Sequence, residues 1–337
     1  YDAENRLTGL TYKHGTAASG TTGCAYDKLG RLASSYVELG NNTHTSSYSY
    51  GTGGQGTGSV SPLVKTLSVP GGSYTYAYSN MRNMTSVNDG TKIVSYQYDK
   101  LGQLTRANDP WDTTAGSDGT TWIYAYDLGG NLTSRKAYAY TTDTVGTAVQ
   151  TIPYTYGDSN WKDKLTAYNG TAISYDAIGN PLTDGTWTYT WQRGRQLGQM
   201  SKTGETAAFT YNAEGIRVKK VCTTTGTTQY TLRGKDIVRI DNPDFKLHFF
   251  YDAQNRPAVV RYADALYGYV YNLQGDVVAL IDSAGNRVVQ YRYDAWGKPL
   301  SKTGSMANTL GTYNPFRYRH YVYDEETGVY YLRSRYY

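Results

Sequence analysis

One short stretch of the sequence, residues 95–106, recurs along the chain and constrains its fold more than any other feature. Tyr96 and Tyr98 alternate with polar residues, which is the two-residue period of a half-buried β-strand. Asp99 then provides a carboxylate that can accept hydrogen bonds from turn amides, and Gly102 can adopt the positive φ that closes a short loop. The stretch therefore predicts a β-hairpin.

The same pattern of tyrosine, aspartate and glycine recurs from one end of the chain to the other. Several neighbouring copies lie 20 residues apart, for example Tyr78 and Tyr98, or Tyr251 and Tyr271. A period of this size, built from strand and turn signals, is typical of an array in which each hairpin packs against the next. We therefore expect an all-β protein, an array of antiparallel β-hairpins. The residues that carry the signature most completely are Tyr26, Asp27, Gly30, Tyr98, Asp99, Gly102, Tyr126, Asp127, Gly130, Tyr175, Asp176, Gly179, Tyr293, Asp294 and Gly297.

The aromatic composition indicates what the faces of this array are like. The chain has 37 tyrosines but only 5 phenylalanines. A buried phenol must find a hydrogen-bond partner or cost about 1–3 kcal/mol, so this composition does not fit a dry core. We expect a broad curved sheet with ladders of stacked tyrosines on its inner face, whose hydroxyls contact water or polar groups of the turns.

Charge and cysteine content say little about partners. The net charge of +5 is small for 337 residues and is dispersed between the repeats. The sequence has no apolar run of the roughly 18 residues that could span a membrane, so we expect no membrane span. Cys24 and Cys222 lie far apart, and we interpret them as small unpaired residues on strands.

Three segments interrupt the array and are interpreted as exposed loops, residues 51–61, 108–120 and 140–150. The first is rich in glycine and is followed by Pro62, which a central strand tolerates poorly because proline has no amide hydrogen. Leu101 is an apolar residue at the tip of a turn, and we expect it to fold back over the next hairpin.

The character of the strands changes in the last third of the chain. From residue 218 they become longer and more apolar, and the run Val277–Ile281 should be buried on both faces. We therefore divide the array into residues 1–217 and a better-packed part, residues 218–337, which continues the first without a break.

The recurring pattern resembles the YD repeat of Rhs proteins, of wall-associated proteins of Gram-positive bacteria, of Tc toxin components and of animal teneurins. The resemblance is most specific in residues 314–321 and 323–337, which are similar, nearly residue for residue, to the Rhs-associated core segment. With the repeats, it covers essentially the whole chain. The core-segment positions that carry it are Pro315, Phe316, Arg317, Tyr318, Tyr323, Asp324, Gly328, Tyr331, Arg333, Arg335 and Tyr336.

This resemblance implies a hollow β-shell in which a spiral of hairpins encloses a variable carboxyl-terminal domain, often a toxin. In the family the core segment acts as a plug, and a motif containing Asp-Pro follows it, where aspartates cleave the chain. This sequence ends at Tyr337, so we expect the cleavage site and the toxin domain to lie outside it. We also expect the chain to be part of a longer bacterial protein that is secreted or displayed at the cell surface. Because the array is shorter than complete shells of the family, we expect an incomplete or open cocoon.

No residue pattern in the chain indicates catalysis. An aspartic self-protease needs two carboxylates that share a proton, but Asp294 and Asp324 each occupy the turn position of a repeat. Residues 51–56 match Gly-x-Gly-x-x-Gly without the strand and helix that a dinucleotide site requires. The turns lack the ligand spacing of an EF-hand, and the histidines lack that of a zinc site. We assign no catalytic, cofactor-binding or metal-binding residue.

The densest basic and aromatic cluster contains Arg317, Arg319, Arg333 and Arg335 among tyrosines. Such residues can bind nucleic acid through phosphate contacts and base stacking, and a packed wall or plug uses them for cation–π contacts. The arginines alternate along strands without a separate basic face. We therefore favour the structural role and predict no nucleic-acid partner.

Two functions compete. In the first, the chain is a non-catalytic scaffold, part of a shell around its own carboxyl-terminal toxin domain. In the second, it is a binding module whose exposed rings, Trp187, Tyr189 and Trp191, stack on glycans of a cell wall or cell surface. In either case, unsealed edge strands at the ends of the array would favour self-association.

Overall fold

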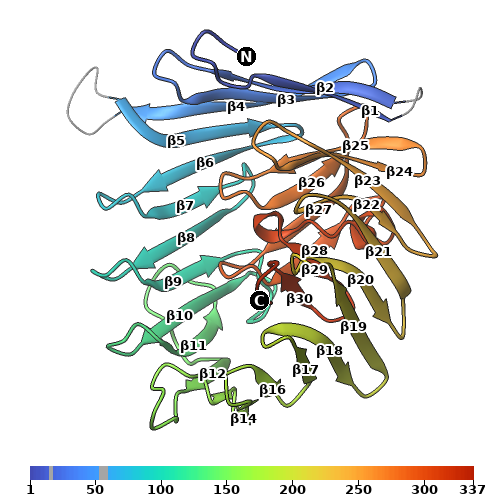
Figure 1. The fold of residues 1–337 in the computed structure, drawn as a ribbon. Coiled ribbons are helices and arrows are strands. Elements are labelled where there is room, and N and C mark those ends of the chain that lie inside the picture. The colour runs from blue at the N-terminus through green and yellow to red at the C-terminus, as the bar shows by residue number, and fades with distance from the viewer. Residues whose placement is uncertain (15–17, 53–59) are drawn as a thin grey trace.

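The computed structural model describes residues 1–14, 18–52 and 60–337, and nearly all of their regular structure is β-strand. The strands form two sheets of 14 strands each, in which strands that follow one another in sequence also pair with one another. The predicted array of antiparallel hairpins is thus confirmed. In Figure 1 the first sheet (blue to green) and the second (yellow to orange) face each other, with the carboxyl terminus between them. The array is open, since β1 lies at the edge of the first sheet and pairs with β2.

The strand boundaries follow the repeats. The first sheet consists of β1 (Gly9–His14), β2 (Ala18–Tyr26), β3 (Leu32–Leu39), β4 (Asn42–Thr52), β5 (Val60–Val69), β6 (Gly72–Tyr78), β7 (Met84–Asn88), β8 (Ile93–Tyr98), β9 (Leu104–Asp109), β10 (Thr120–Tyr126), β11 (Leu132–Ala139), β12 (Gln150–Thr155), β13 (Ala167–Tyr168) and β14 (Thr171–Ala172). The second consists of β15 (Ser174–Tyr175), β16 (Pro181–Thr183), β17 (Thr188–Gln192), β18 (Gln196–Lys202), β19 (Glu205–Tyr211), β20 (Arg217–Cys222), β21 (Gly226–Arg233), β22 (Asp236–Asp241), β23 (Lys246–Tyr251), β24 (Pro257–Tyr262), β25 (Ala265–Tyr271), β26 (Val277–Ile281), β27 (Arg287–Tyr293) and β28 (Pro299–Thr303). After them come α1 (Leu310–Tyr313), a 3-10 turn η1 (Tyr318–His320), and a small hairpin of β29 (Val322–Asp324) and β30 (Val329–Tyr331).

The signature turn has the geometry that its residues predict. Asp99 Oδ1 accepts hydrogen bonds from the amides two and four residues further on, both at 2.9 Å. Gly102 has a φ of +79°, which a residue with a Cβ adopts only with strain. The strand then pairs Tyr98 with Leu104 after a register shift, which marks a β-bulge next to the turn. The same shift recurs at Tyr26, Tyr78, Tyr126, Tyr175, Tyr211, Tyr251, Tyr271 and Tyr293.

The signature tyrosine fastens each hairpin to the one before it. Tyr98 Oη donates a hydrogen bond to the carbonyl of Met84 at 2.9 Å, and Met84 opens the second strand of the preceding hairpin. The phenols therefore use a backbone carbonyl of the neighbouring hairpin as acceptor. Each such bond adds about 0.5–1.5 kcal/mol to the strand pairing. Equivalent bonds of 2.5–3.2 Å are made by Tyr50, Tyr78, Tyr126, Tyr156, Tyr175, Tyr211, Tyr251, Tyr271 and Tyr293.

The best-packed strands are β24, β25 and β26, which are covered on both faces. On one face Ile281 belongs to a buried cluster that includes Leu39 of the first sheet. On the other face Leu280 belongs to a cluster that includes Phe316 of the core segment. The prediction that Val277–Ile281 is buried on both faces is confirmed, since four of its residues are fully buried and Val278 is partly buried.

The first predicted loop is only partly correct. Residues 53–59 lie outside the described part of the chain, and Pro62 belongs to β5. The pairing of β4 with β5 is irregular on both sides of Tyr50, so Pro62 lies in a bulged part of the ladder. A proline is tolerated there because the regular pattern of amide hydrogen bonds is already interrupted.

The third predicted loop is confirmed, since the chain between β11 and β12 is irregular and mostly exposed. The second is only partly correct, because the chain is irregular between Asp109 and Thr120 but Asn108, Asp109, Asp112 and Thr120 are buried. The prediction for Leu101 is wrong. Its side chain is 82% exposed at the tip of its turn, because the turn projects beyond the strands of the next hairpin.

Candidate functional site

The inner face of the second sheet holds residues 304–337, which consist of α1 with its flanking residues and the core segment. Leu310 of α1 is fully buried, and Phe316 and Tyr331 are almost fully buried in the same cluster as residues of β22 to β27. Phe316 meets the ring of Phe249 edge to face at 5.0 Å. The segment is therefore packed into the concave side of the sheet.

A buried ionic network fastens this segment to β20. Asp324 accepts hydrogen bonds from Arg217 at 2.5 and 3.0 Å and from Lys220 at 2.9 Å, and the side chains of Asp324 and Arg217 are each 1% exposed. Lys220 also bonds Glu326 at 2.7 Å. Burial by itself would raise the pKa of Asp324, but the two cations outweigh it and hold the pKa below its usual value.

A second set of polar contacts organises the segment internally. Asn314 is fully buried, accepts a hydrogen bond from Tyr269 at 2.6 Å and donates one to the carbonyl of Phe316 at 2.8 Å. Arg317, which is 2% exposed, donates to the carbonyl of Gly311 at 2.7 Å. Because these groups are buried, leaving any of them unpaired would cost about 1–3 kcal/mol, which favours one conformation of the segment.

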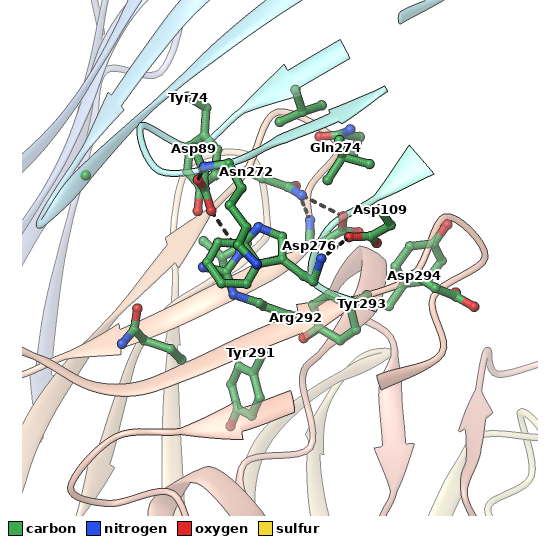
Figure 2. Close-up of a pocket in the computed structure, with 18 of the residues that line it drawn as sticks. Tyr74, Asp89, Asp109, Asn272, Gln274, Asp276, Tyr291, Arg292, Tyr293 and Asp294 are labelled. Carbon is green, nitrogen blue, oxygen red and sulfur yellow. Dashed lines mark hydrogen bonds and ion pairs between the residues drawn. The ribbon is translucent and has the colours of Figure 1, made fainter. Parts of the chain in front are cut away.

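The two sheets meet at a polar cavity of about 330 Å³, which is lined by residues of β6 to β9 on one side and by the β25/β26 turn, β26, β27 and η1 on the other. Figure 2 shows Asp89 and Arg292 meeting across this cavity. Arg292 pairs with Asp89 at 2.9 Å and stacks over the ring of Trp111 at 3.4 Å. Nearby, Trp296 packs against Tyr124 with ring centroids 5.8 Å apart. We call this region the seam.

Three carboxyl groups that line the seam have raised pKa values. Burial raises the pKa of Asp109 to about 6, and it also raises the pKa of Asp276 and of Asp294. Each of these carboxyl groups nevertheless accepts a hydrogen bond from at least one backbone amide. Asp109 accepts from the amide of Trp111 at 2.8 Å, and Asp294 accepts from the amides two and four residues on at 2.9 Å. Asp276 accepts from the amide of Arg319 at 2.9 Å. Since these oxygens hold turns in place, the arrangement favours a structural role.

The signature aspartates fill the turn role that the sequence predicts, with one exception. Asp27, Asp127, Asp176 and Asp294 accept hydrogen bonds from amides of their own turns, as Asp99 does. The turn role predicted for the side chain of Asp324 is wrong. It points instead to the buried cations of β20, more than 100 residues away in sequence.

The three rings that the sequence analysis considered for glycan stacking are less accessible than assumed. Trp187 is 6% exposed and lies in a core cluster, with Lys202 Nζ 4.4 Å above its ring. Tyr189 donates its hydroxyl to Asp184 at 2.7 Å, and Trp191 donates its indole N–H to the carbonyl of Pro181 at 2.6 Å. The assumption that they form an exposed row is wrong for Trp187, because its ring packs in a buried cluster with residues of β18, β19 and β20.

Sequence reasoning missed the residues that hold the parts together, above all Arg217, Lys220, Arg292 and Trp111. Their partners are distant in sequence, so no local pattern could reveal them. The only available signal is that Arg217 and Lys220 are charged residues within a strand otherwise rich in valine. A charge at an inward position of a strand predicts a buried partner.

Three further features bear on possible functions: metal-binding clusters, cysteine thiols and membrane-spanning helices. Within residues 1–14, 18–52 and 60–337, no group of three or more His, Cys, Asp or Glu side chains is placed to hold a metal ion. Cys24 and Cys222 are both buried and both free thiols. No helix in the described ranges has the length and apolar character needed to cross a bilayer.

Comparison with known sequences gives a partial match to several longer proteins. A family model described as the teneurin YD-shell matches residues 1–153. The tRNA nuclease WapA of Bacillus subtilis is 37% identical over 187 residues, which cover 53% of this chain and 8% of that protein. The tRNA3(Ser)-specific nuclease WapA of Bacillus spizizenii is 38% identical over 186 residues, with the same coverage. The chain thus matches less than a tenth of the length of these relatives.

Comparison with solved structures covers nearly the whole chain. The Tc holotoxin pore of Photorhabdus luminescens aligns with 98% of this chain and 19% of its own, with a TM-score of 0.59 and 17% identity. A crystal structure of TcdB2-TccC3 aligns with 98% of this chain and 20% of its own, with a TM-score of 0.56 and 15% identity. At such low identity the likeness establishes a shared fold.

Proposed function

We propose that this chain, a YD-repeat β-shell protein of the Rhs and Tc toxin type, is a non-catalytic scaffold that encloses and presents a toxin domain carried beyond its carboxyl end. The proposal treats residues 1–217 as shell wall and residues 218–337 as wall plus plug. The parent protein would be secreted or displayed on a bacterial surface.

The observation that carries the proposal is the docking of the core segment on the concave side of the second sheet. Tyr330 and Tyr337 pair through their backbones at 2.7 and 2.9 Å, and Tyr337 Oη bonds the carbonyl of Trp296 at 2.5 Å. In Figure 1 the carboxyl terminus lies between the two sheets. Any residues that follow Tyr337 in a longer protein would therefore start inside the concavity.

A protection experiment tests the scaffold role. A flexible peptide with a protease site would be fused after Tyr337, and the same peptide would be fused before Tyr1 in a matched control. We expect cleavage at the carboxyl-terminal site to be at least tenfold slower, because the walls restrict access. Equal cleavage rates at the two ends would contradict the proposal.

The absence of catalysis is a separate part of the proposal. Purified chain incubated for days between pH 5 and pH 8 should keep its full mass, since the perturbed carboxyls of the seam are used as turn caps. A defined internal cut that disappears in an Asp109→Asn or Asp294→Asn variant would reverse this conclusion.

The glycan-binding alternative has less support. Trp187 is buried, and the polar atoms of Tyr189 and Trp191 are engaged within the protein. Binding of the chain to cell-wall glycans that Tyr189→Ala and Trp191→Ala both weaken would favour this alternative over a pure scaffold.

A further inference from the structure

A small cavity lies where the last turn of the core segment meets the turn that joins β17 to β18. Its volume is about 200 Å³, and the guanidinium-bearing residues Arg193, Arg195 and Arg333 line it. No Asp or Glu is among the described residues that form its wall. We call this cavity the arginine pocket.

Two of the arginines reach the pocket from the β17/β18 turn. Gln192 pairs with Gln196 across this turn, so Arg193 and Arg195 lie on either side of its central residue. Arg195 donates a hydrogen bond to the carbonyl of Ile178 at 2.8 Å, which ties the turn to a neighbouring one. Both arginines are exposed, and neither forms an ion pair with a carboxylate of the described residues. Their charges are therefore uncompensated within this part of the chain.

The third arginine reaches the pocket from the end of the core segment. The amide of Leu332 donates to the carbonyl of Arg335 at 2.9 Å, so Arg333 lies at the tip of a tight turn. Arg333 pairs with Asp236 at 3.1 Å, yet its side chain is still 51% exposed. Glu214 lies in an adjoining turn and, within the described ranges, pairs with none of the three arginines. Three guanidiniums thus share one carboxylate, which leaves an excess of positive charge at the pocket.

The other polar groups that line the pocket do not offset this charge. The hydroxyls of Tyr211 and Tyr336 bond each other at 2.7 Å. Burial raises the pKa of Tyr211 to about 12 and also raises the pKa of Tyr336, so both phenols are neutral at physiological pH. Ser334 and Gln196 also line the pocket, and their hydroxyl and amide groups can donate hydrogen bonds. The lining is therefore rich in donors and free of negative charge.

We infer that the arginine pocket is a binding site for a small ligand that carries a phosphate or diphosphate group. A phosphoryl group presents three acceptor oxygens and up to about two negative charges, so guanidiniums from two different turns can bond to the same group. A carboxylate has only two oxygens in one plane and a single charge, which suits three converging guanidiniums less well. The site is independent of the scaffold role, because it needs no toxin domain.

Isothermal titration calorimetry with inorganic pyrophosphate tests this assignment. The wild-type chain should bind about one equivalent with a dissociation constant below roughly 1 mM in about 0.05 M salt. Citrate has a similar charge but only carboxylates, so it should bind about fivefold more weakly or worse. The double variant Arg193→Asn and Arg333→Asn should raise the dissociation constant for pyrophosphate by about tenfold or more.

The variants are chosen to preserve the fold. Arg193 and Arg333 have φ values of +47° and +69°, a region that asparagine adopts more readily than arginine, so the double variant should melt as the wild type does. The matched control, Arg82→Asn with Lys100→Asn, removes the same charge from exposed turns of the first sheet, and Arg82 has a φ of +64°. This control should leave the affinity unchanged. Asp236→Asn should tighten binding about twofold or more, because it frees Arg333 from its carboxylate.

Several outcomes would contradict the site. The absence of saturable binding up to about 10 mM pyrophosphate would do so, and so would an equal loss of affinity in the Arg82 and Lys100 control. Citrate that binds as tightly as pyrophosphate would rule out the phosphate class of ligand. An affinity unchanged by Asp236→Asn would place Arg333 outside the site. None of these results bears on the protection of a peptide fused after Tyr337, so the scaffold proposal is tested separately.

Discussion

Replacing Asp324 by asparagine should loosen the core segment from the second sheet. The change keeps the size of the side chain and removes its charge. Arg217 would then lie buried without its anion, since its side chain is 1% exposed and both of its contacts to Asp324 are charge-assisted. Lys220 is less affected because it keeps Glu326 at 2.7 Å.

The expected magnitude follows from this geometry. Removing one partner of a buried ion pair costs about 3–5 kcal/mol, because the remaining charge has lost both its water and its counter-ion. If the loss is confined to the plug, amide hydrogen exchange in β29 and β30 should accelerate by about two to three and a half orders of magnitude, at 1.4 kcal/mol per factor of ten. Urea denaturation would show the same loss in the free energy of unfolding.

A matched exposed pair and a double variant make the result interpretable. Asp264 pairs with Arg261 but is 88% exposed, so Asp264→Asn should change little. Arg217→Met combined with Asp324→Leu should be less destabilised than either single substitution, since an apolar pair removes both charges at once. Exchange in β29 and β30 that is unchanged in Asp324→Asn would refute the idea that this network holds the plug.

The other predictions concern the repeat and the seam. Tyr98→Phe should lower the free energy of unfolding by about 0.5–1.5 kcal/mol through loss of its bond to the preceding hairpin, whereas Tyr1→Phe, at an exposed terminus, should have no measurable effect on urea denaturation. Gly102→Ala should destabilise the chain by more than about 1 kcal/mol because φ there is +79°, while Gly146→Ala, with open space and ordinary φ, should be neutral in thermal melting. The raised pKa of Asp109 means that the folded state binds its proton more tightly than the unfolded state, so this group should add up to about 3 kcal/mol of stability as the pH falls from 7 towards 4. Asp109→Asn should flatten that part of the pH profile of unfolding, and an unaltered profile would show that the carboxyl is not buried as described.

Much of the wall could be read from the sequence because its determinants are local. The alternation of Tyr96 and Tyr98 specifies a strand face, and Asp99 and Gly102 specify the turn, within a single hairpin. The same reasoning failed at Leu101, where burial depends on how far a turn projects past its neighbour. It also failed at Pro62, where a bulge in its own strand makes a proline acceptable.

The site was accessible to sequence reasoning only through resemblance. The core segment is recognisable from residues 314–337, but its partners are not. In the sequence, Asp324 resembles the other turn aspartates and Arg292 resembles an ordinary strand residue. Only the folded chain pairs Asp324 with Arg217 and Arg292 with Asp89.

The sequence by itself determined that the chain forms a continuous strip of hairpins, since each repeat contains its own strand, turn and tyrosine contact to the hairpin before it. Only the tertiary structure decided how that strip curves, which strands become covered on both faces, and which charges meet in the interior. The physical reason is that curvature accumulates over many small twists between strands, so contacts between Asp324 and Arg217 depend on the sum of all the hairpins between them.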